Sequence, residues 1–525
     1  RNFPAISILA CMFSAIISSG LKRKAARALN CCLMIAVGIM SLMTLMYTLS
    51  TGESYVYVMG KFPAPWGNEI RFGVLEAGMA LFFSIIMLLS MLGGRQKIKD
   101  EVSERKEFLY YVLVDLLLSS LLALIYTNDL FTAYVFVEIN TIAAAGLIVI
   151  RENGRNIEAG IRYMIMSLLG SGLLLLGIMM TYDLTGHLLM SNIKESLATV
   201  MADSSQTVTV SVTISLLVCG LAVKSALFPF HSWLPDAYGY STVSSAAMLS
   251  SLVSKGYIFL LIKIFYRVVG FDVISGSHIF NVLFVFGLIA MISGSVSAIR
   301  ENDIRRMVSF SSIAQIGYIY MGFGLGVREG IIASIFHILS HAATKSMLFI
   351  SAIGLTDVSR GSRHFVDLTG SALRNKLAGA GFMVGSLSMV GIPLFSGFIS
   401  KLQFMDASFS AGKIKLILAL VVLGISTILN AIYFMKTVLR IYTPVEKITE
   451  ATNVTGIVAG GAESEIVHTD RIGINGVVEE RDRLTFKQQK LYGVVIICFI
   501  ALNIALGIFS NTILDWINRG LDLFS

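Results

Sequence analysis

The stretch "TVTVSVTISLLVCGLAVKSALFPFHSWLPD", residues 207–236, decides the fold. It opens on a predominantly apolar run, and about 20 such residues are needed to cross a bilayer core of about 30 Å. Lys224 stands at the end of this run, and Pro229 and Pro235 follow it closely. Proline removes a backbone donor and clashes with the preceding turn. The stretch therefore predicts a membrane helix that breaks beside a charged side chain.

Composition extends this prediction to the whole chain. Of its 525 residues, 55% are hydrophobic and only 14% are charged, whereas soluble domains carry about 25% charged residues. About fourteen apolar spans recur, at 3–20, 28–50, 73–93, 108–127, 130–150, 161–182, 207–228, 241–266, 279–299, 307–325, 330–354, 378–400, 415–440 and 491–513. They lack the short alternating pattern of an outer-membrane barrel. The sequence predicts an all-α polytopic membrane protein with about 14 transmembrane helices.

Basic residues predict the orientation of these helices. The loops after the first, third, fifth, ninth and eleventh spans contain "KRKAAR", "RQKIKDEVSERK", "RENGR", "RENDIRR" and "RGSR". Cytoplasmic loops carry an excess of Lys and Arg. We therefore expect a multi-pass protein of the cytoplasmic membrane with both termini on the non-cytoplasmic side. The Gly-rich, mixed-charge insert 441–490 is expected to be an extramembrane loop, and the first residue, Arg1, suggests that an initiator or short leader is missing.

Several kinds of chemistry have no motif here. The five cysteines form no CxxC pair and show no metal-ligand spacing. No GxGxxG motif follows a strand, and no Walker motif is present. We expect the chain to bind no metal, nucleotide, flavin or iron–sulfur cofactor of its own, and no nucleic acid.

Charged residues within spans are candidates for function, because each costs a few kcal/mol to insert. Glu138 lies near the middle of its span, and Lys255 is too central to reach either membrane surface by snorkelling. Lys263, near the end of the same span, is expected to snorkel. Lys224 and Lys401 are ambiguous by position alone, since a lysine at a helix end can also snorkel. A helix break beside each of them favours a position at depth.

The second break is predicted from "GIPLFSGFISK", where Pro393 precedes Lys401. Two interrupted helices in different halves of a transporter point to its translocation site. A further pattern is "FHILSHAATKSMLF", in which His337, His341 and Lys345 are spaced i, i+4, i+8 on one helix face. They are either satisfied core residues or a hydrogen-bonded chain. Histidine changes charge near neutral pH, so such a chain bridged by water can pass protons but no bulky solute.

These motifs together resemble one family. The matching segments are "NDLFTAYVFVEINTIAAAGLIV", "KSALFPFHSWLPDAYG", "SSLVSKGYIFLL", "ENDIRRMVSFSSIAQIGYIYMG", "FHILSHAATKSMLF" and "GIPLFSGFISKLQF". The chain resembles the antiporter-like subunits of respiratory complex I, membrane-bound hydrogenases and Mrp-type cation/proton antiporters. The sequences of its motifs are most similar to the hydrogenase and Mrp branches. One segment departs from the family pattern, because "YGYSTVSSA" stands where a His- and Pro-rich turn is usual. This difference weakens the assignment of a proton entry path near Tyr238.

The resemblance implies fourteen helices with two inverted five-helix repeats, each containing a broken helix. The expected organisation is N-terminal helices 1–3 (1–107), first repeat (108–269), second repeat (270–440), extramembrane loop (441–490) and C-terminal helix 14 (491–525). The implied translocation residues are the glutamate that modulates the first lysine, that lysine, a relay lysine, the helical chain of three and a terminal lysine: Glu138, Lys224, Lys255, His337, His341, Lys345 and Lys401.

The implied function is translocation of protons, with sodium as the other candidate, by a non-redox subunit of an oxidoreductase or translocase complex. Its implied partners are the lipid bilayer, other membrane subunits, including further antiporter-like subunits, and a peripheral redox arm with iron–sulfur subunits. The alternative is a subunit of a redox-free Mrp-type Na⁺/H⁺ antiporter, and a third is a scaffold with an inactive channel. The electron donor and acceptor and the coupling ion stay open at this point.

Overall fold

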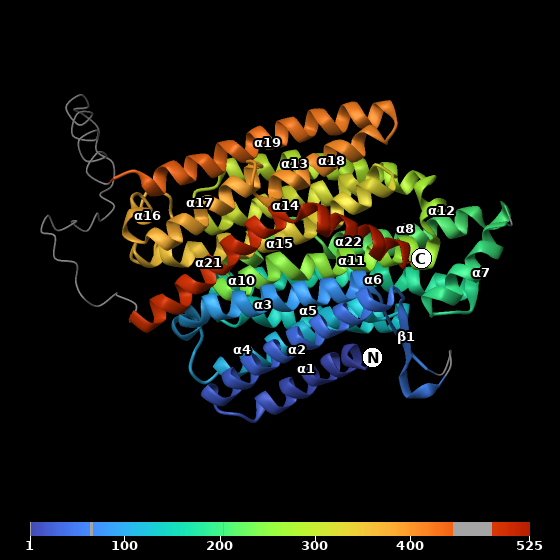
Figure 1. Cartoon of the computed structure of the whole chain (residues 1–525), viewed down its shortest axis with the longest axis horizontal. Helices are drawn as coiled ribbons and strands as arrows, with labels where there is room; N and C mark the ends of the chain where they lie inside the picture. Colours follow the sequence, from blue (N-terminus) through green and yellow to red (C-terminus); the bar gives the residue numbers. More distant parts are fainter. Residues whose placement is uncertain (1, 63–66, 203, 445–485, 525) are drawn as a thin grey trace, which may run out of the picture.

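The computed structural model describes residues 2–62, 67–202, 204–444 and 486–524. Its long helices run side by side along the longest axis of the molecule (Figure 1). Both described ends of the chain lie toward the end of the bundle that carries α7 and α12, and α16 lies at the opposite end (Figure 1). Nearly all of the expected loop 441–490 falls outside the described residues.

The elements before the first helix break are α1 (Phe3–Ser19), α2 (Arg23–Thr51), β1 (Tyr55–Val58), β2 (Glu69–Phe72), α3 (Val74–Glu101), α4 (Glu107–Tyr126), α5 (Leu130–Val149), α6 (Gly154–Thr185), α7 (Met190–Ala202) and α8 (Thr207–Lys224). The elements between the breaks are α9 (Leu234–Tyr240), α10 (Val243–Met248), α11 (Ser254–Lys263), α12 (Phe271–Ser275), α13 (His278–Arg300), α14 (Ile304–Gly324), α15 (Arg328–Asp357), α16 (Ser371–Arg374) and α17 (Lys376–Val390). After the second break follow α18 (Ser396–Phe409), α19 (Lys413–Tyr442), α21 (Phe486–Ile508) and α22 (Ser510–Asp522). The two strands pair antiparallel, with Tyr55 opposite Phe72.

The all-α polytopic membrane fold is confirmed. Within the described residues, 11 helices are long and apolar enough to cross a membrane. Helices α1, α14, α17 and α18, which coincide with predicted spans, fall outside this set. The total of fourteen spans and the inverted repeats therefore stay predictions. The small hairpin and α7 were not predicted, because both lie in polar connections between spans.

The helices break at both predicted places. Helix α8 ends at Lys224 and α9 begins at Leu234, so residues 225–233 interrupt the span. Helix α17 ends at Val390 and α18 begins at Ser396. Backbone groups freed inside a membrane are tolerated only where protein or water satisfies them. The surroundings of each break must therefore be polar.

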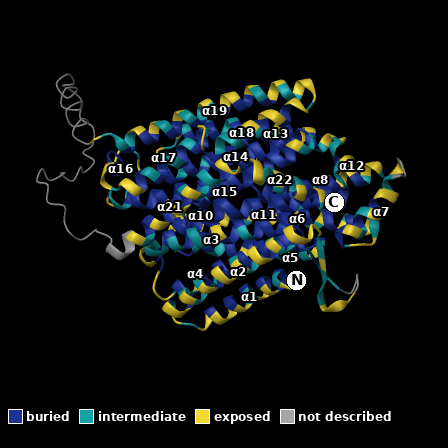
Figure 2. Cartoon of the chain, viewed as in Figure 1, coloured by how far each residue is buried: buried dark blue, intermediate teal, exposed yellow. Residues whose placement is uncertain are grey.

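Burial separates central helices from peripheral ones. The segment 243–269, which contains α10 and α11, and helix α15 are buried throughout their apolar windows. Exposed residues concentrate on outer helices such as α1, α2 and α19 (Figure 2). Many of these are large apolar side chains, for example Ile16 and Ile414. The two central helices, which carry Lys255 and the His337–Lys345 stripe, thus face protein rather than lipid.

Small residues allow the helix that carries Lys224 to pack closely. A Cβ added at Gly220 of α8 would lie 2.6 Å from the Leu174 nitrogen and 2.8 Å from the Gly170 oxygen on α6. Both are backbone atoms and cannot move aside. Membrane helices commonly use such contacts, because close packing takes the place of hydrophobic burial.

We therefore expect Gly220→Leu to destabilise the bundle by about 3 kcal/mol or more, the upper end of the overpacking range. Gly172→Leu is the matched control, because no atom lies within 4 Å of its added Cβ. The measurement is thermal unfolding of the two purified variants in mild detergent. Equal melting temperatures for both would contradict the packing argument.

The prediction that Lys263 snorkels to the membrane surface is wrong. Its exposed fraction is 0%. Its Nζ donates hydrogen bonds to the carbonyl oxygens of Leu124, at 3.2 Å, Ile125, at 3.0 Å, and Thr127. The last carbonyls of a helix lack intrahelical partners and carry partial negative charge. Lys263 therefore caps the end of α4 instead of reaching water.

Candidate functional site

The first helix break brings Lys224 and Glu138 together. Lys224 is the last residue of α8, and its side chain is fully buried. Its Nζ lies 3.4 Å from Oε1 of Glu138 on α5. The same carboxylate oxygen accepts a hydrogen bond from Ser171 of α6. Within the described part of the chain, no other two of the seven predicted residues form an ion pair with each other.

Lys224 also has neutral partners. Its Nζ donates to Oγ1 of Thr141 at 2.7 Å and lies 5.6 Å from the centre of the Tyr257 ring. Helix α6 passes so close that a Cβ at Gly170 would lie 2.8 Å from the lysine Cγ. A buried ammonium needs such compensation. The lysine is therefore held by a hydroxyl and an aromatic face even without the carboxylate.

The second helix break surrounds Lys401 in a similar way. Its Nζ donates to the Val390 carbonyl oxygen at 2.7 Å, which the end of α17 leaves free, and to Oγ1 of Thr427 at 3.1 Å. The Tyr318 ring centre lies 5.9 Å away. Gly391 has φ +93°, and a Cβ there would lie 2.9 Å from the lysine Cδ. Each break thus holds a lysine with a threonine and a tyrosine, but Lys401 has no ion-pair partner in the described part of the chain.

Lys255 lies on the buried central segment between the two breaks. Its exposed fraction is 0%, and its Nζ donates to the carbonyl oxygen of Ser250. Residues 249–253 form a π-helical turn. Such turns disturb the regular hydrogen-bond ladder and often mark functional positions in helices. The lysine is therefore solvated by its own backbone, with no carboxylate beside it among the described residues.

The polar face of α15 contacts two neighbouring elements, α14 and the segment that carries Lys255. Lys345 is fully buried, and its Nζ donates to the Val308 carbonyl oxygen at 2.7 Å and to Oγ of Ser311, both on α14. The adjacent Ser346 lies 2.8 Å, oxygen to oxygen, from Ser251 on the Lys255 segment. Hydroxyl groups therefore connect the helix of Lys255 with the helix of Lys345.

The two histidines lie toward the second break. Their rings stack with centroids 5.8 Å apart. Nδ1 of His337 is 2.7 Å from Oγ of Ser400 on α18, the residue directly before Lys401. Nε2 of His337 and both ring nitrogens of His341 are buried without a protein partner. Buried polar atoms of this kind are usually satisfied by ordered water, which is what proton transfer between such groups requires.

One polar residue at the centre was missed by the sequence reasoning. Asn503 of α21 is fully buried, and its Nδ2 donates to Oγ1 of Thr344 at 2.7 Å, between His341 and Lys345 on α15. Asn503 stands in the middle of the apolar span 491–513, and a polar amide at such a depth was a usable signal in the sequence. The C-terminal helix thus contributes to the polar centre.

The structure brings some of the predicted residues into contact and leaves others apart. Glu138 contacts Lys224, and His337 stacks on His341. The remaining three lysines each bind a backbone carbonyl oxygen instead of one another: Lys255, Lys345 and Lys401. The roles assigned to all seven residues stay predictions.

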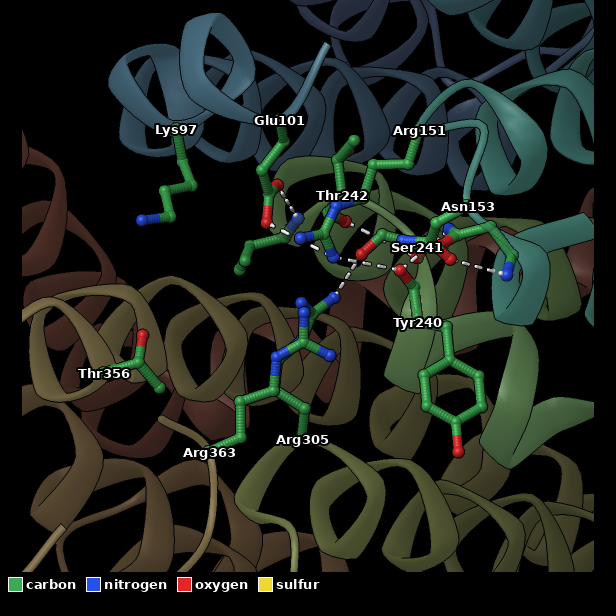
Figure 3. A network of polar contacts seen from close by, with 12 residues as sticks. Lys97, Glu101, Arg151, Asn153, Tyr240, Ser241, Thr242, Arg305, Thr356 and Arg363 are labelled. Atoms are coloured by element: carbon green, nitrogen blue, oxygen red, sulfur yellow. Dashed lines mark hydrogen bonds and ion pairs between the residues drawn. The ribbon is translucent and has the colours of Figure 1, made fainter. Parts of the chain in front are cut away.

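A separate network fixes the turn that leads into the Lys255 segment (Figure 3). Backbone carbonyls at 238–241 accept hydrogen bonds from three arginines that come from three different parts of the chain: Arg151, Arg305 and Arg363. Glu101 of α3 accepts from the Val243 backbone N–H at 3.1 Å. The turn belongs to the segment "YGYSTVSSA", residues 238–246. Arginine contacts therefore hold this turn in place.

Comparisons with known proteins find related sequences and structures. A family model described as NADH:quinone oxidoreductase/Mrp antiporter, TM, matches residues 127–427. NADH-quinone oxidoreductase subunit N of Desulforudis audaxviator is 32% identical over 398 residues, which cover 75% of this chain and 77% of that protein.

Two solved structures share the fold. A chain of the archaeal membrane-bound sulfane sulfur reductase, a respiratory membrane complex, has a TM-score of 0.82 and 24% identity, covering 100% of this chain and 97% of that one. A chain of the Mrp complex from Dietzia sp. has a TM-score of 0.81 and 24% identity, covering 100% and 96%. At this identity the likeness concerns the fold alone.

Proposed function

Because the chain belongs to the NADH:quinone oxidoreductase/Mrp antiporter transmembrane family, we propose that it translocates protons as an antiporter-like subunit of a redox-driven membrane complex. The observation that carries the proposal is the ion pair of Glu138 and Lys224 at a helix break. A charge pair at membrane depth is expensive and is usually functional.

The pair can exist in two arrangements. Glu138 has Ser171 as a second partner, and Lys224 has Thr141. A small rotation of the Glu138 side chain, with α5 and Thr141 staying in place, can therefore separate the two charges without leaving either group unbonded. With the carboxylate close, the charged lysine is stabilised; with the carboxylate withdrawn, the lysine is free to give up its proton.

The released proton then passes to the second half of the molecule. Lys255, the α15 stripe and Lys401 supply titratable nitrogens, and Ser251, Ser346 and Ser400 supply hydroxyl groups between them. Lysine and histidine bind protons, whereas a sodium ion needs oxygen ligands. The side chains along this route therefore favour protons as the translocated ion.

An exposed charge supports the presence of a membrane partner. The Glu138 side chain is 29% exposed, on a helix where apolar neighbours such as Val135 and Ile142 are also exposed. A carboxylate facing lipid at mid-span is costly. We propose that another membrane subunit covers this face of α5, and that a peripheral arm with iron–sulfur subunits supplies the energy.

Purification in mild detergent, through an affinity tag on this chain, tests the proposal. We expect further antiporter-like subunits together with iron–sulfur subunits, detected by mass spectrometry and by electron paramagnetic resonance after reduction. A stable complex of antiporter subunits alone, which exchanges Na⁺ for H⁺ in vesicles without any redox substrate, would favour the Mrp-type alternative instead.

The orientation is a further prediction. Helix α7 lies at the opposite end of the bundle from the start of α4 (Figure 1), and the basic loops favour a cytoplasmic position for the start of α4. We expect a cysteine at Thr199 of α7 to react with a membrane-impermeant maleimide in intact cells. A cysteine at Glu104 should react only after the membrane is opened, and the parent chain gives the background. The reverse labelling pattern would overturn the orientation.

A further inference from the structure

A buried carboxylate lies apart from the series that the proposed function uses. Asp115 is on α4, before the residues that the family model matches, and its exposed fraction is 0%. Helix α4 packs there against α1 and α2. Asp115 stands eight residues into a helix of 20 residues, well inside the apolar part of the bundle.

The contacts of this carboxylate are all neutral. Oγ of Ser14 on α1 donates to Oδ2 at 2.7 Å, and Nδ2 of Asn30 on α2 donates to Oδ1 at 2.5 Å. Asp115 has no Lys, Arg or His ion-pair partner in the described part of the chain. An ionised carboxylate without a cation is costly in such surroundings. The alternative without a function in proton binding is a permanent polar link between α1, α2 and α4.

The amide of Asn30 points to a second state of the site. Its Oδ1 atom is buried and has no hydrogen-bond partner. Turning the amide over places this oxygen, in place of the nitrogen, beside Asp115, where it can accept a hydrogen bond from a protonated carboxyl group. The two amide orientations thus suit the two charge states: the amide N–H binds the carboxylate, and the amide oxygen binds the carboxylic acid.

The spacing of these atoms suits a proton rather than a metal ion. Oxygen ligands at about 2.4 Å from a metal ion lie about 3.4 Å from one another in octahedral geometry. The separations at Asp115 are 2.7 Å to Ser14 and 2.5 Å to Asn30. These are hydrogen-bond lengths, with no room for an ion between the groups.

A polar row leads from Asp115 to the end of the bundle. Glu107, Tyr111 and Asp115 are spaced i, i+4, i+8 on α4, so each stands about one turn, roughly 6 Å, from the next. The hydroxyl of Tyr111 donates to Glu107 at 3.0 Å. Glu107 is 1% exposed and pairs at 3.3 Å with Arg23, which also contacts the 82% exposed Glu104.

We propose that Asp115, with Ser14 and Asn30, is a proton-binding site that exchanges with the surface at the start of α4 through Tyr111 and Glu107. The site is independent of the lysine–histidine series and does not rest on the function proposed for it. The buried thiol of Cys11 on α1 is a titratable group on which the charge of Asp115 acts. A neutral thiol leaves the carboxyl free to gain and lose its proton.

Infrared difference spectroscopy of the purified complex in lipid nanodiscs, recorded from acidic to alkaline pH, tests the proposal. We expect a carboxylic acid C=O band that grows as the pH falls, is absent in Asp115→Asn and shifts in frequency in Asn30→Leu. Cys11→Ser should keep it. Should Asp115→Asn fail to assemble, the Asn30→Leu comparison decides. A spectrum without any band sensitive to either substitution, or with such a band at constant intensity across pH, would overturn the proposal in favour of a fixed link.

The exchange route has its own readout. Transfer to deuterated buffer shifts the carboxyl band, and the rate of this shift reports access to the site. We expect Tyr111→Phe to slow the shift several-fold, while Glu104→Gln, an exposed control at the same end, leaves it unchanged. An unchanged rate in Tyr111→Phe would exclude the route through Tyr111. Loss of pumping in variants of the lysine series has no bearing on either measurement.

Discussion

Glu138→Gln is expected to lower proton pumping by about tenfold or more while the complex still assembles. An opposite charge at ion-pair distance changes a protonation equilibrium by about ten- to a thousandfold. Glutamine keeps the size of the side chain and the contact with Ser171, but it removes the charge that stabilises protonated Lys224 at 3.4 Å. Pumping is measured in vesicles that contain the reconstituted complex.

Two controls separate charge from structure. Glu138→Asp keeps the negative charge and should retain more pumping than the glutamine variant. Glu158→Gln removes a 62% exposed carboxylate that pairs with Arg162 on the surface of α6, and such exposed pairs contribute little. If Glu138→Gln pumps like the parent and like Glu158→Gln, the Glu138–Lys224 pair is structural and the proposed mechanism fails at its first step.

The charged members of the site could be predicted from the sequence, but most of their partners could not. A lysine or glutamate inside an apolar span is visible because its insertion is costly. Thr141, Thr427, Tyr257 and Tyr318 give no such signal, since hydroxyl and aromatic residues are ordinary in membrane helices. Their selection as partners depends on how the helices pack around each break.

Lys263 is a charged residue whose surroundings could not be predicted from the sequence. Its position near the end of a span favours snorkelling, because a lysine stem normally reaches water from there. The sequence does not show that the end of α4 lies beside it and offers three carbonyl oxygens. Position along one helix thus predicts depth, whereas solvation depends on the neighbouring helices.

Lys401→Ala is expected to abolish pumping, to below about a tenth of the parent rate, if the lysine is the terminal proton site of the series. Its Nζ binds the carbonyl oxygen of Val390 and the hydroxyl of Thr427. Alanine leaves both without this donor, which costs about 1 kcal/mol for each lost hydrogen bond. That loss is small enough for the complex to assemble, so a defect in pumping can be measured separately.

Lys401→Arg distinguishes a proton carrier from a positive anchor at the end of a broken helix. Arginine keeps the charge and the donors toward Val390, but its guanidinium does not release a proton at any physiological pH. A proton carrier therefore fails with arginine as well as with alanine. Lys415 is the matched control, because its Nζ also binds a carbonyl at a helix end, Gly324, at 2.7 Å, without belonging to the series. Lys415→Arg should pump normally, and full pumping by Lys401→Arg would remove Lys401 from the proton path.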